Sequence, residues 1–209
     1  ASASNSSTNN EYYYDVLNGL PTSTTSKVQF SVAYGHYAGS GSDNQSGSSA
    51  DDIRGPSEVI YKSFASMLLP ETEITGGFHI SQSGHREEDI YVLVAERANM
   101  EDGINRKNWT LTLSGSMTTT SGSGTIELTD DSNVAVGTPT FYGLRYNIVS
   151  GSQGKNLVSS STKTYGHFWP NLGVWIFSGK QLSASIPGEA VTTAAVVYQS
   201  SSQYGFGTN

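Results

Sequence analysis

The sequence predicts a mostly β (α+β) fold, namely an antiparallel, β-sandwich-like domain with one short helix at about 57–69 and mobile termini. Composition is the first reason. Ser, Thr and Gly make up more than a third of the 209 residues, and only 14% of the residues are charged, against about 25% in an ordinary soluble domain. Patterning is the second reason, because many short segments alternate apolar and polar residues, whereas a single segment carries a helical apolar stripe.

The alternating segments predict the strands. In 27–34, Val28, Phe30 and Val32 share one face, which is typical of a half-buried strand. The segment 89–95, DIYVLVA, is apolar on both faces and is therefore expected at the centre of a sheet. Further strands are expected at 109–113, 125–129, 141–149, 173–177 and 194–199.

The connections between these strands have recognisable turn chemistry. The polar stretch between 109–113 and 125–129 predicts a hairpin with a long solvated tip. Pro170-Asn171 predicts the turn before the strand 173–177. Residues 38–51 are too polar to bury and are expected to form a flexible connection.

The helix is predicted over 57–69. Pro56 suits a first-turn position, where its missing N–H costs nothing, and Glu58 lies near the positive end of the helix dipole. Pro70 ends the helix. The expected buried stripe consists of Ile60, Phe64, Met67 and Leu68.

The chain divides by composition into a flexible N-terminal arm (1–20), one mostly β structural domain (21–199) and a flexible C-terminal tail (200–209). Aromatic residues stand out in the two terminal segments. Tyr and Trp are enriched where proteins meet, so these side chains are candidate interface residues. The set is Tyr12, Tyr13, Tyr14, Tyr204 and Phe206.

Several function classes are disfavoured by composition. The absence of Cys excludes structural disulfides, Cys-based metal sites and a thiol nucleophile. The net charge of −7 and the pI near 4.9 argue against nucleic acid as a partner. No apolar run approaches the roughly 20 residues of a membrane span, and the first ten residues do not resemble a signal peptide.

The four histidines, His36, His79, His85 and His167, lack metal-site spacing. We expect His36 and His167 to be partly buried and to hydrogen-bond the backbone, with His85 in a solvated loop. The oxygen-rich run 129–133 could bind calcium, but an Asx-type turn after the strand 125–129 is the commoner explanation. No metal, cofactor or catalytic residue is predicted.

Two further patterns leave alternatives open. The acid pairs Glu71/Glu73, Glu87/Glu88 and Asp130/Asp131 could serve a hydrolase, but they are expected to face solvent. Trp109, Trp169, Trp175, Phe168 and Tyr12–Tyr14 could stack on sugars, as in a carbohydrate-binding module, or lie in the core and at interfaces, which is the more frequent arrangement.

The segment from Val59 to Leu182 resembles virion structural proteins of tailed bacteriophages, especially large contractile-tailed phages of cyanobacterial and marine hosts. The segments that carry the resemblance are VIYKSFASMLLPE (59–71), EDIYVLVAERANMEDGINRKNWTLTLSG (88–115), ELTDDS (127–132), YNIVSGSQG (146–154) and YGHFWPNLGVWIFSGKQL (165–182).

This resemblance implies a structural component of the virion, in the tail or baseplate region, that acts by assembly and is not an enzyme. It implies other virion proteins and copies of the same chain as partners, hence a homo-oligomer, with no nucleic acid and no membrane. Assembly in the host cytoplasm fits the absence of Cys. A head decoration or neck protein, a host-surface carbohydrate-binding module and a particle-borne hydrolase remain as alternatives.

Overall fold

The strands form one continuous antiparallel sheet in the order β1-β2-β3-β4-β10-β9-β8-β6-β5, and β7 pairs with β8 outside this path. The computed structural model describes residues 2–4, 13–39, 55–81, 84–116 and 123–183. The mostly β, antiparallel fold class expected from the sequence is confirmed. The strands are β1 (Ser2–Ser4), β2 (Tyr13–Leu17), β3 (Val28–His36), β4 (Asp89–Ala95), β5 (Leu111–Ser116), β6 (Ser123–Asp130), β7 (Thr138–Thr140), β8 (Gly143–Ser150), β9 (Gly166–Trp169) and β10 (Val174–Ser178).

Helices occupy little of the described chain. The longest is α1 (Pro56–Leu68), followed by the single turn α2 (Glu71–Ile74). A 3-10 turn, η1 (Arg97–Asn99), follows β4, and α3 (Gly179–Ser183) follows β10.

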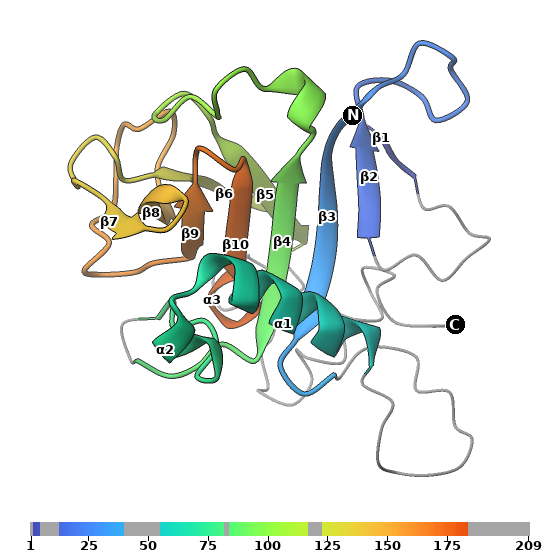
Figure 1. Ribbon diagram of the computed structural model, residues 1–209. Coiled ribbons are helices and arrows are strands. Elements are labelled where there is room, and N and C mark those ends of the chain that lie inside the picture. Colours follow the sequence, from blue (N-terminus) through green and yellow to red (C-terminus); the bar gives the residue numbers. More distant parts are fainter. Residues whose placement is uncertain (1, 5–12, 40–54, 82–83, 117–122, 184–209) are drawn as a thin grey trace, which may run out of the picture.

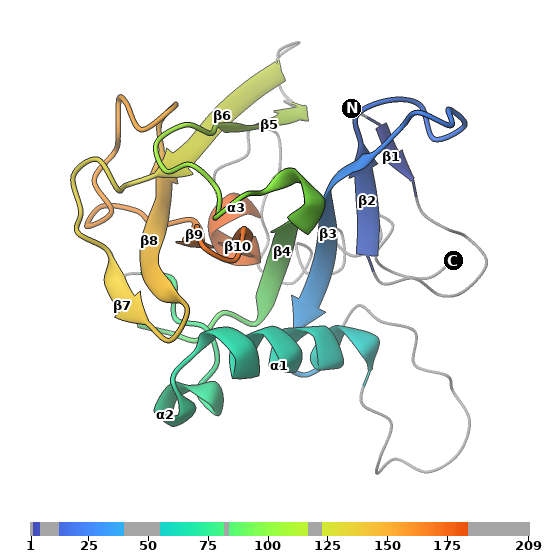
Figure 2. The same ribbon diagram turned by 45° about the horizontal axis from the view of Figure 1, so that its top comes forward.

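The sheet is curled and has an apolar core on each face. Figures 1 and 2 show α1 on one side of the strand pair β4–β10 and the hairpin β5–β6 on the other. Alternate residues of β10 therefore enter different cores: Val174 and Ile176 pack with α1, whereas Trp175 and Phe177 pack with β5 and β6. This arrangement explains why every residue of β10 is buried.

The helix is confirmed, but its buried stripe is shifted from the expected one. The side chains that face the sheet are Ser57, Tyr61, Ala65 and Leu68, whereas Ile60, Phe64 and Met67 are only partly buried. A close approach of helix and sheet explains the shift. Gly35 on β3 lies beneath α1, and a Cβ there would be only 3.0 Å from the backbone nitrogen of Tyr61.

Most predicted strands are confirmed with small changes in their ends. The strand 89–95 has the expected limits, and β5 begins two residues later than expected, at Leu111. The hairpin is confirmed by the antiparallel pairing of Leu113 with Ile126. The turn at Pro170-Asn171 is confirmed as well, since Gly173, with φ of 65°, donates its N–H to Trp169 O at 3.0 Å.

Part of the expected N-terminal arm is a strand, which corrects the boundary at residue 20. Residues 13–17 form β2 and pair with β3, with Tyr14 opposite Val32 and Val16 opposite Phe30. The pairing satisfies backbone groups of β3 that would otherwise be an open sheet edge. The strand expected at 194–199 and the tail 200–209 lie outside the described residues, as does most of the connection 38–51.

Candidate functional site

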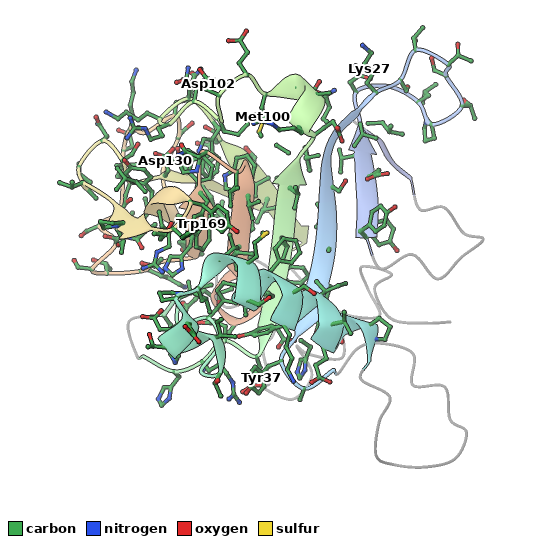
Figure 3. The ribbon with its side chains drawn as sticks, viewed as in Figure 1. Lys27, Tyr37, Met100, Asp102, Asp130 and Trp169 are labelled. Atoms are coloured by element: carbon green, nitrogen blue, oxygen red, sulfur yellow. The ribbon has the colours of Figure 1, made fainter. Side chains whose placement is uncertain are left out.

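Trp169 and Trp175 are core residues and Trp109 is partly buried against one of these cores, so the three tryptophans do not form an open sugar-binding platform. Trp169 is fully buried in the core beneath α1, where Figure 3 labels it, and Trp175 is 7% exposed in the other core. The rings of Trp175 and Phe168 stack at 4.8 Å, and Trp109 meets both rings edge-on. Their aromatic faces are therefore already covered by protein.

The expected terminal interface set is only partly described. Tyr13 on β2 is 45% exposed, and Tyr14 on the same strand is partly buried. Tyr12, Tyr204 and Phe206 lie outside the described residues. A role for this set in contacts therefore stays a prediction.

The histidines lie apart from one another. His36 is buried, and its Nδ1 accepts a hydrogen bond from the N–H of Ala38 at 3.0 Å, as expected. His167 is buried but its Nδ1 has no hydrogen-bond partner, so the expected backbone hydrogen bond is not found at that atom. His79 and His85 are exposed. In the part of the chain that the structure describes, no three His, Asp or Glu side chains gather closely enough to hold a metal ion.

A buried polar link joins β3 to β4 beside His36. The hydroxyl of Tyr34 donates a hydrogen bond to Asp89, and His36 Nε2 lies 3.9 Å from the same carboxylate oxygen. Burial raises the pKa of Asp89, although the hydrogen bond from Tyr34 and the charge of His36 act to lower it. Burial, and then Asp89 itself, raise the pKa of Tyr34. Tyr34, His36 and Asp89 together link β3 to β4 at the end of these strands near α1.

The expectation that all the acid pairs face solvent is wrong for three of the six carboxylates. Glu71 and Glu73 are exposed as expected, but Glu87, Asp130 and Asp131 are buried. Burial is tolerated because each of the three carboxylates accepts specific hydrogen bonds.

Asp130 and Asp131 accept hydrogen bonds that fix the end of β6 to Lys107 and to Asn147 of β8. Asp130 Oδ1 accepts the N–H of Lys107 at 2.9 Å, and its Oδ2 accepts the N–H of Ser132 at 3.3 Å, which is the expected Asx-type turn. Asp131 binds both the backbone and the side-chain nitrogen of Asn147, at 3.0 and 2.9 Å. N–H donors thus already occupy these oxygens, which makes them poor candidates for calcium ligands.

The segment 134–141, on either side of β7, exposes large apolar side chains. Val134 is 74% exposed, Val136 87% and Phe141 94%. Phe141 contacts only one ring, that of Tyr142, edge-on at 5.1 Å, among the described aromatic residues. The turn that carries it is well defined, because Thr140 Oγ1 donates a hydrogen bond to Gly143 O at 2.7 Å.

A groove of about 650 Å³ begins beside this turn, with Gly143 as one of its lining residues. Its apolar lining includes Met100, Ile104 and Leu144, and the exposed carboxylates of Glu101 and Asp102 lie at its border. Figure 3 shows Met100 and Asp102 on the segment that follows β4. The groove is held in shape by the hydrogen bond from Ile104 N–H to Pro170 O, at 2.9 Å, and by the contact of Arg106 with the Tyr146 hydroxyl.

Arg145 lies on β8, opposite Thr138 of β7, and is partly buried. No hydrogen bond or ion pair of its guanidinium is found among the described residues. Burial lowers the pKa of Arg145, and the charge of Glu73 partly offsets this effect. Burial, together with the charge of Arg145, lowers the pKa of His167 well below its ordinary value, so His167 is neutral at pH 7.

The sequence patterns do not predict the exposed segment 134–141 or the position of Arg145 beside it. Val134 and Val136 lie in a short apolar run, Val-Ala-Val, between Asn133 and Gly137, which is too short to indicate a strand or a helix. Phe141 falls inside an expected strand, and Arg145 is one of several scattered cations. The available signal is the run of apolar residues in a segment with Gly137 and Pro139, which a buried strand would not contain.

The longest helix in the described ranges has 13 residues, and none of these helices has the length and apolarity that a membrane-spanning helix requires. In comparisons with known proteins, no family model matches the sequence, and neither the curated proteins nor the solved structures yield a similar chain.

Proposed function

We propose that this chain is a structural component of a tailed-bacteriophage virion, in the tail or baseplate region, and that it acts by oligomeric assembly without catalysing a reaction. The placement in a phage particle rests on the resemblance of residues 59–182. The observation that carries the assembly role is the exposure of Val134, Val136 and Phe141 within eight residues of chain. Clustered exposed apolar side chains mark surfaces that bind another protein.

The buried polar groups support a structural role. The carboxylates of Glu87, Asp130 and Asp131 accept hydrogen bonds that fix loops and strands, and no open cleft is needed to explain them. The covered faces of Trp169 and Trp175 leave no specific observation in favour of the carbohydrate-binding alternative. The proposed partners are other virion proteins and copies of this chain, with the virion as the location.

The composition of purified particles tests this proposal. Quantitative mass spectrometry of particles should find the chain at a fixed copy number relative to the major structural proteins. A density map of the particle would then separate the tail or baseplate from a head-decoration or neck position. Absence of the chain from particles would overturn the proposal.

A second experiment tests whether the exposed segment 134–141 is the contact surface on which the proposal rests. Particles assembled with Phe141→Ser should contain less of the chain than wild-type particles, because an exposed aromatic anchor is lost. Leu20→Ser is a matched control, since Leu20 is 68% exposed but lies outside the segment 134–141. Equal incorporation of both variants would argue against the segment as a contact surface.

A further inference from the structure

The strand β5 forms an open edge of the sheet. Among the described residues it pairs only with β6, and it stands last in the strand order. Edge strands of soluble proteins usually carry charged residues or a proline that discourage further pairing, or they are covered by another segment. The sequence of β5, LTLSGS, contains no charged residue and no proline. We therefore expect another segment to cover this edge.

The apolar core beside β5 is also open at its periphery. Leu111 and Leu113 of β5 and Ile126 of β6 pack against this core but are only partly buried. Across the same core, Leu93 of β4 is partly buried as well. A strand next to β5 would cover Leu111 and Leu113 and would remove further apolar surface from water.

The chain that follows the last described element starts from this core. α3 follows β10 directly, and Leu182 on α3 is buried together with Leu128 and Phe177. In Figure 2, α3 lies between the hairpin β5–β6 and β4. Residues 184–209 continue from α3 and lie outside the described ranges.

Residues 194–199, AAVVYQ, have the sequence pattern of a strand and match β5 in length and in their lack of charge. In a strand, Ala194, Val196 and Tyr198 share one face, which is wholly apolar. A strand outside β5 would lie five strand spacings from β10, about 24 Å at about 4.8 Å each. Residues 184–193 can span about 33 Å when extended, which is enough to reach this position.

We propose that residues 194–199 add to the edge of β5 as a further strand of the same chain, with Val196 facing Leu111 and Leu113. The connection through α3 favours the chain's own segment over that of another copy, because a short linker keeps it at a local concentration in the millimolar range. While the segment is in place, it prevents copies of the chain from pairing through β5. The inference concerns the free chain and does not depend on the virion role or on the segment 134–141.

A spin label on the C-terminal segment tests this placement in the 209-residue chain. Because the chain has no Cys, Ser200→Cys gives a nitroxide a single attachment site directly after the proposed strand. The NMR amide signals of Leu111–Ser116 should be strongly broadened relative to the reduced, diamagnetic label. The signals of α2, on the opposite side of the sheet, should not change. Unbroadened β5 signals would overturn the inference.

A mixed sample identifies the source of the segment. Isotope-labelled chain without nitroxide is mixed with spin-labelled chain without isotope, so that only contacts between copies broaden the signals. No broadening of β5 signals is expected. Broadening as strong as in the singly labelled sample would show that a second copy supplies the segment, and it would overturn the same-chain placement.

Proline substitution tests the backbone pairing. Val196→Pro removes an N–H from the proposed strand, whereas Ser201→Pro, in the same part of the chain but outside 194–199, is the matched control. In hydrogen exchange, the β5 amides that point away from β6 should exchange about tenfold faster or more in Val196→Pro than in Ser201→Pro. The amides of β10, at the centre of the sheet, report whether both variants are folded. Equal exchange of the β5 amides in the two folded variants would contradict the pairing.

Sedimentation tests whether the segment protects the edge. Val196→Pro should self-associate at lower concentrations than Ser201→Pro, because the edge of β5 is then free to pair. Faster exchange of the β5 amides without increased self-association would leave the added strand standing and would refute its protective role.

Discussion

The hydroxyl of Ser178, at the end of β10, donates a hydrogen bond of 2.6 Å to the carboxylate of Glu87, just before β4. Both residues are buried, and Ser178 Oγ also accepts the N–H of Gln181 at 3.0 Å, which ties α3 to the sheet. Burial raises the pKa of Glu87, although the hydrogen bonds from Ser178 and from the backbone of Ser81 act to lower it. The desolvation of the carboxylate outweighs its hydrogen bonds.

Glu87→Gln should therefore gain stability relative to the wild type as the pH rises. A raised pKa in the folded state means that the contribution of Glu87 is fully present below the ordinary pKa near 4.5 and is lost as the pH rises through the folded value. The substituted amide stays neutral at every pH, and its oxygen can still accept the hydrogen bond from Ser178. Urea unfolding at pH 4 and pH 7 measures the difference. Glu88→Gln, at an exposed neighbour, is the control, and an equal difference at both pH values would contradict the prediction.

His167 should make the protein less stable in mild acid. Its pKa in the folded state is well below 6.5, so its contribution is present above about pH 6.5 and is lost as the pH falls toward the folded value. The free energy of unfolding should fall by up to about 1.4 kcal/mol per pH unit in this window from His167 alone. His167→Phe should flatten the curve, whereas His85→Gln, at an exposed site, should not. An unchanged slope in His167→Phe would show that other groups govern the acid response.

The strands were predictable where the pattern was unambiguous. The segment 89–95 is apolar on both faces, and it lies at the centre of the sheet with cores on both sides. The predicted helix stripe is right at Leu68 but places Ile60, Phe64 and Met67 where Tyr61 and Ala65 are buried, because Tyr61 was not recognised as a core residue. A tyrosine becomes one only when its hydroxyl finds partners, and these partners come from residues distant in the sequence.

The burial of polar side chains was less predictable for a related reason. Whether a carboxylate such as Asp131 is buried depends on the N–H donors of Asn147, which lies on the separate strand β8. The partial burial of Arg145 likewise depends on the pairing of β8 with β7. Composition predicts that the chain has an interface, but it does not indicate which segment of the chain would form it.

Tyr61→Phe should destabilise the protein through two buried backbone groups. The Tyr61 hydroxyl donates to Glu87 O at 2.7 Å and accepts the N–H of Phe78 at 2.9 Å. Removing it leaves both groups without a partner, which costs about 1–3 kcal/mol of unfolding free energy. Tyr37→Phe is the matched control, because that hydroxyl donates a single, exposed hydrogen bond to Thr75 O. Equal effects of the two substitutions in urea unfolding would refute this account.

Gly166→Ala should disrupt the centre of the sheet. Gly166 lies on β9 between Ile148 and Phe177, and a Cβ there would be 2.1 Å from the carbonyl oxygen of Ile176. Because the obstacle is backbone in a paired strand, it cannot move without breaking the pairing of β9 with β10, and we expect a loss of about 3 kcal/mol or more.

Gly84→Ala provides the contrast for Gly166→Ala, since Gly84 has φ of 67° and no atom within 4 Å of the added Cβ. It should cost only the strain of a left-handed conformation, about 1–2 kcal/mol. Chemical unfolding of both variants measures the difference. If Gly166→Ala were tolerated as well as Gly84→Ala, β9 and β10 could not lie as close together as described, and the two-sided burial of β10 would need another explanation.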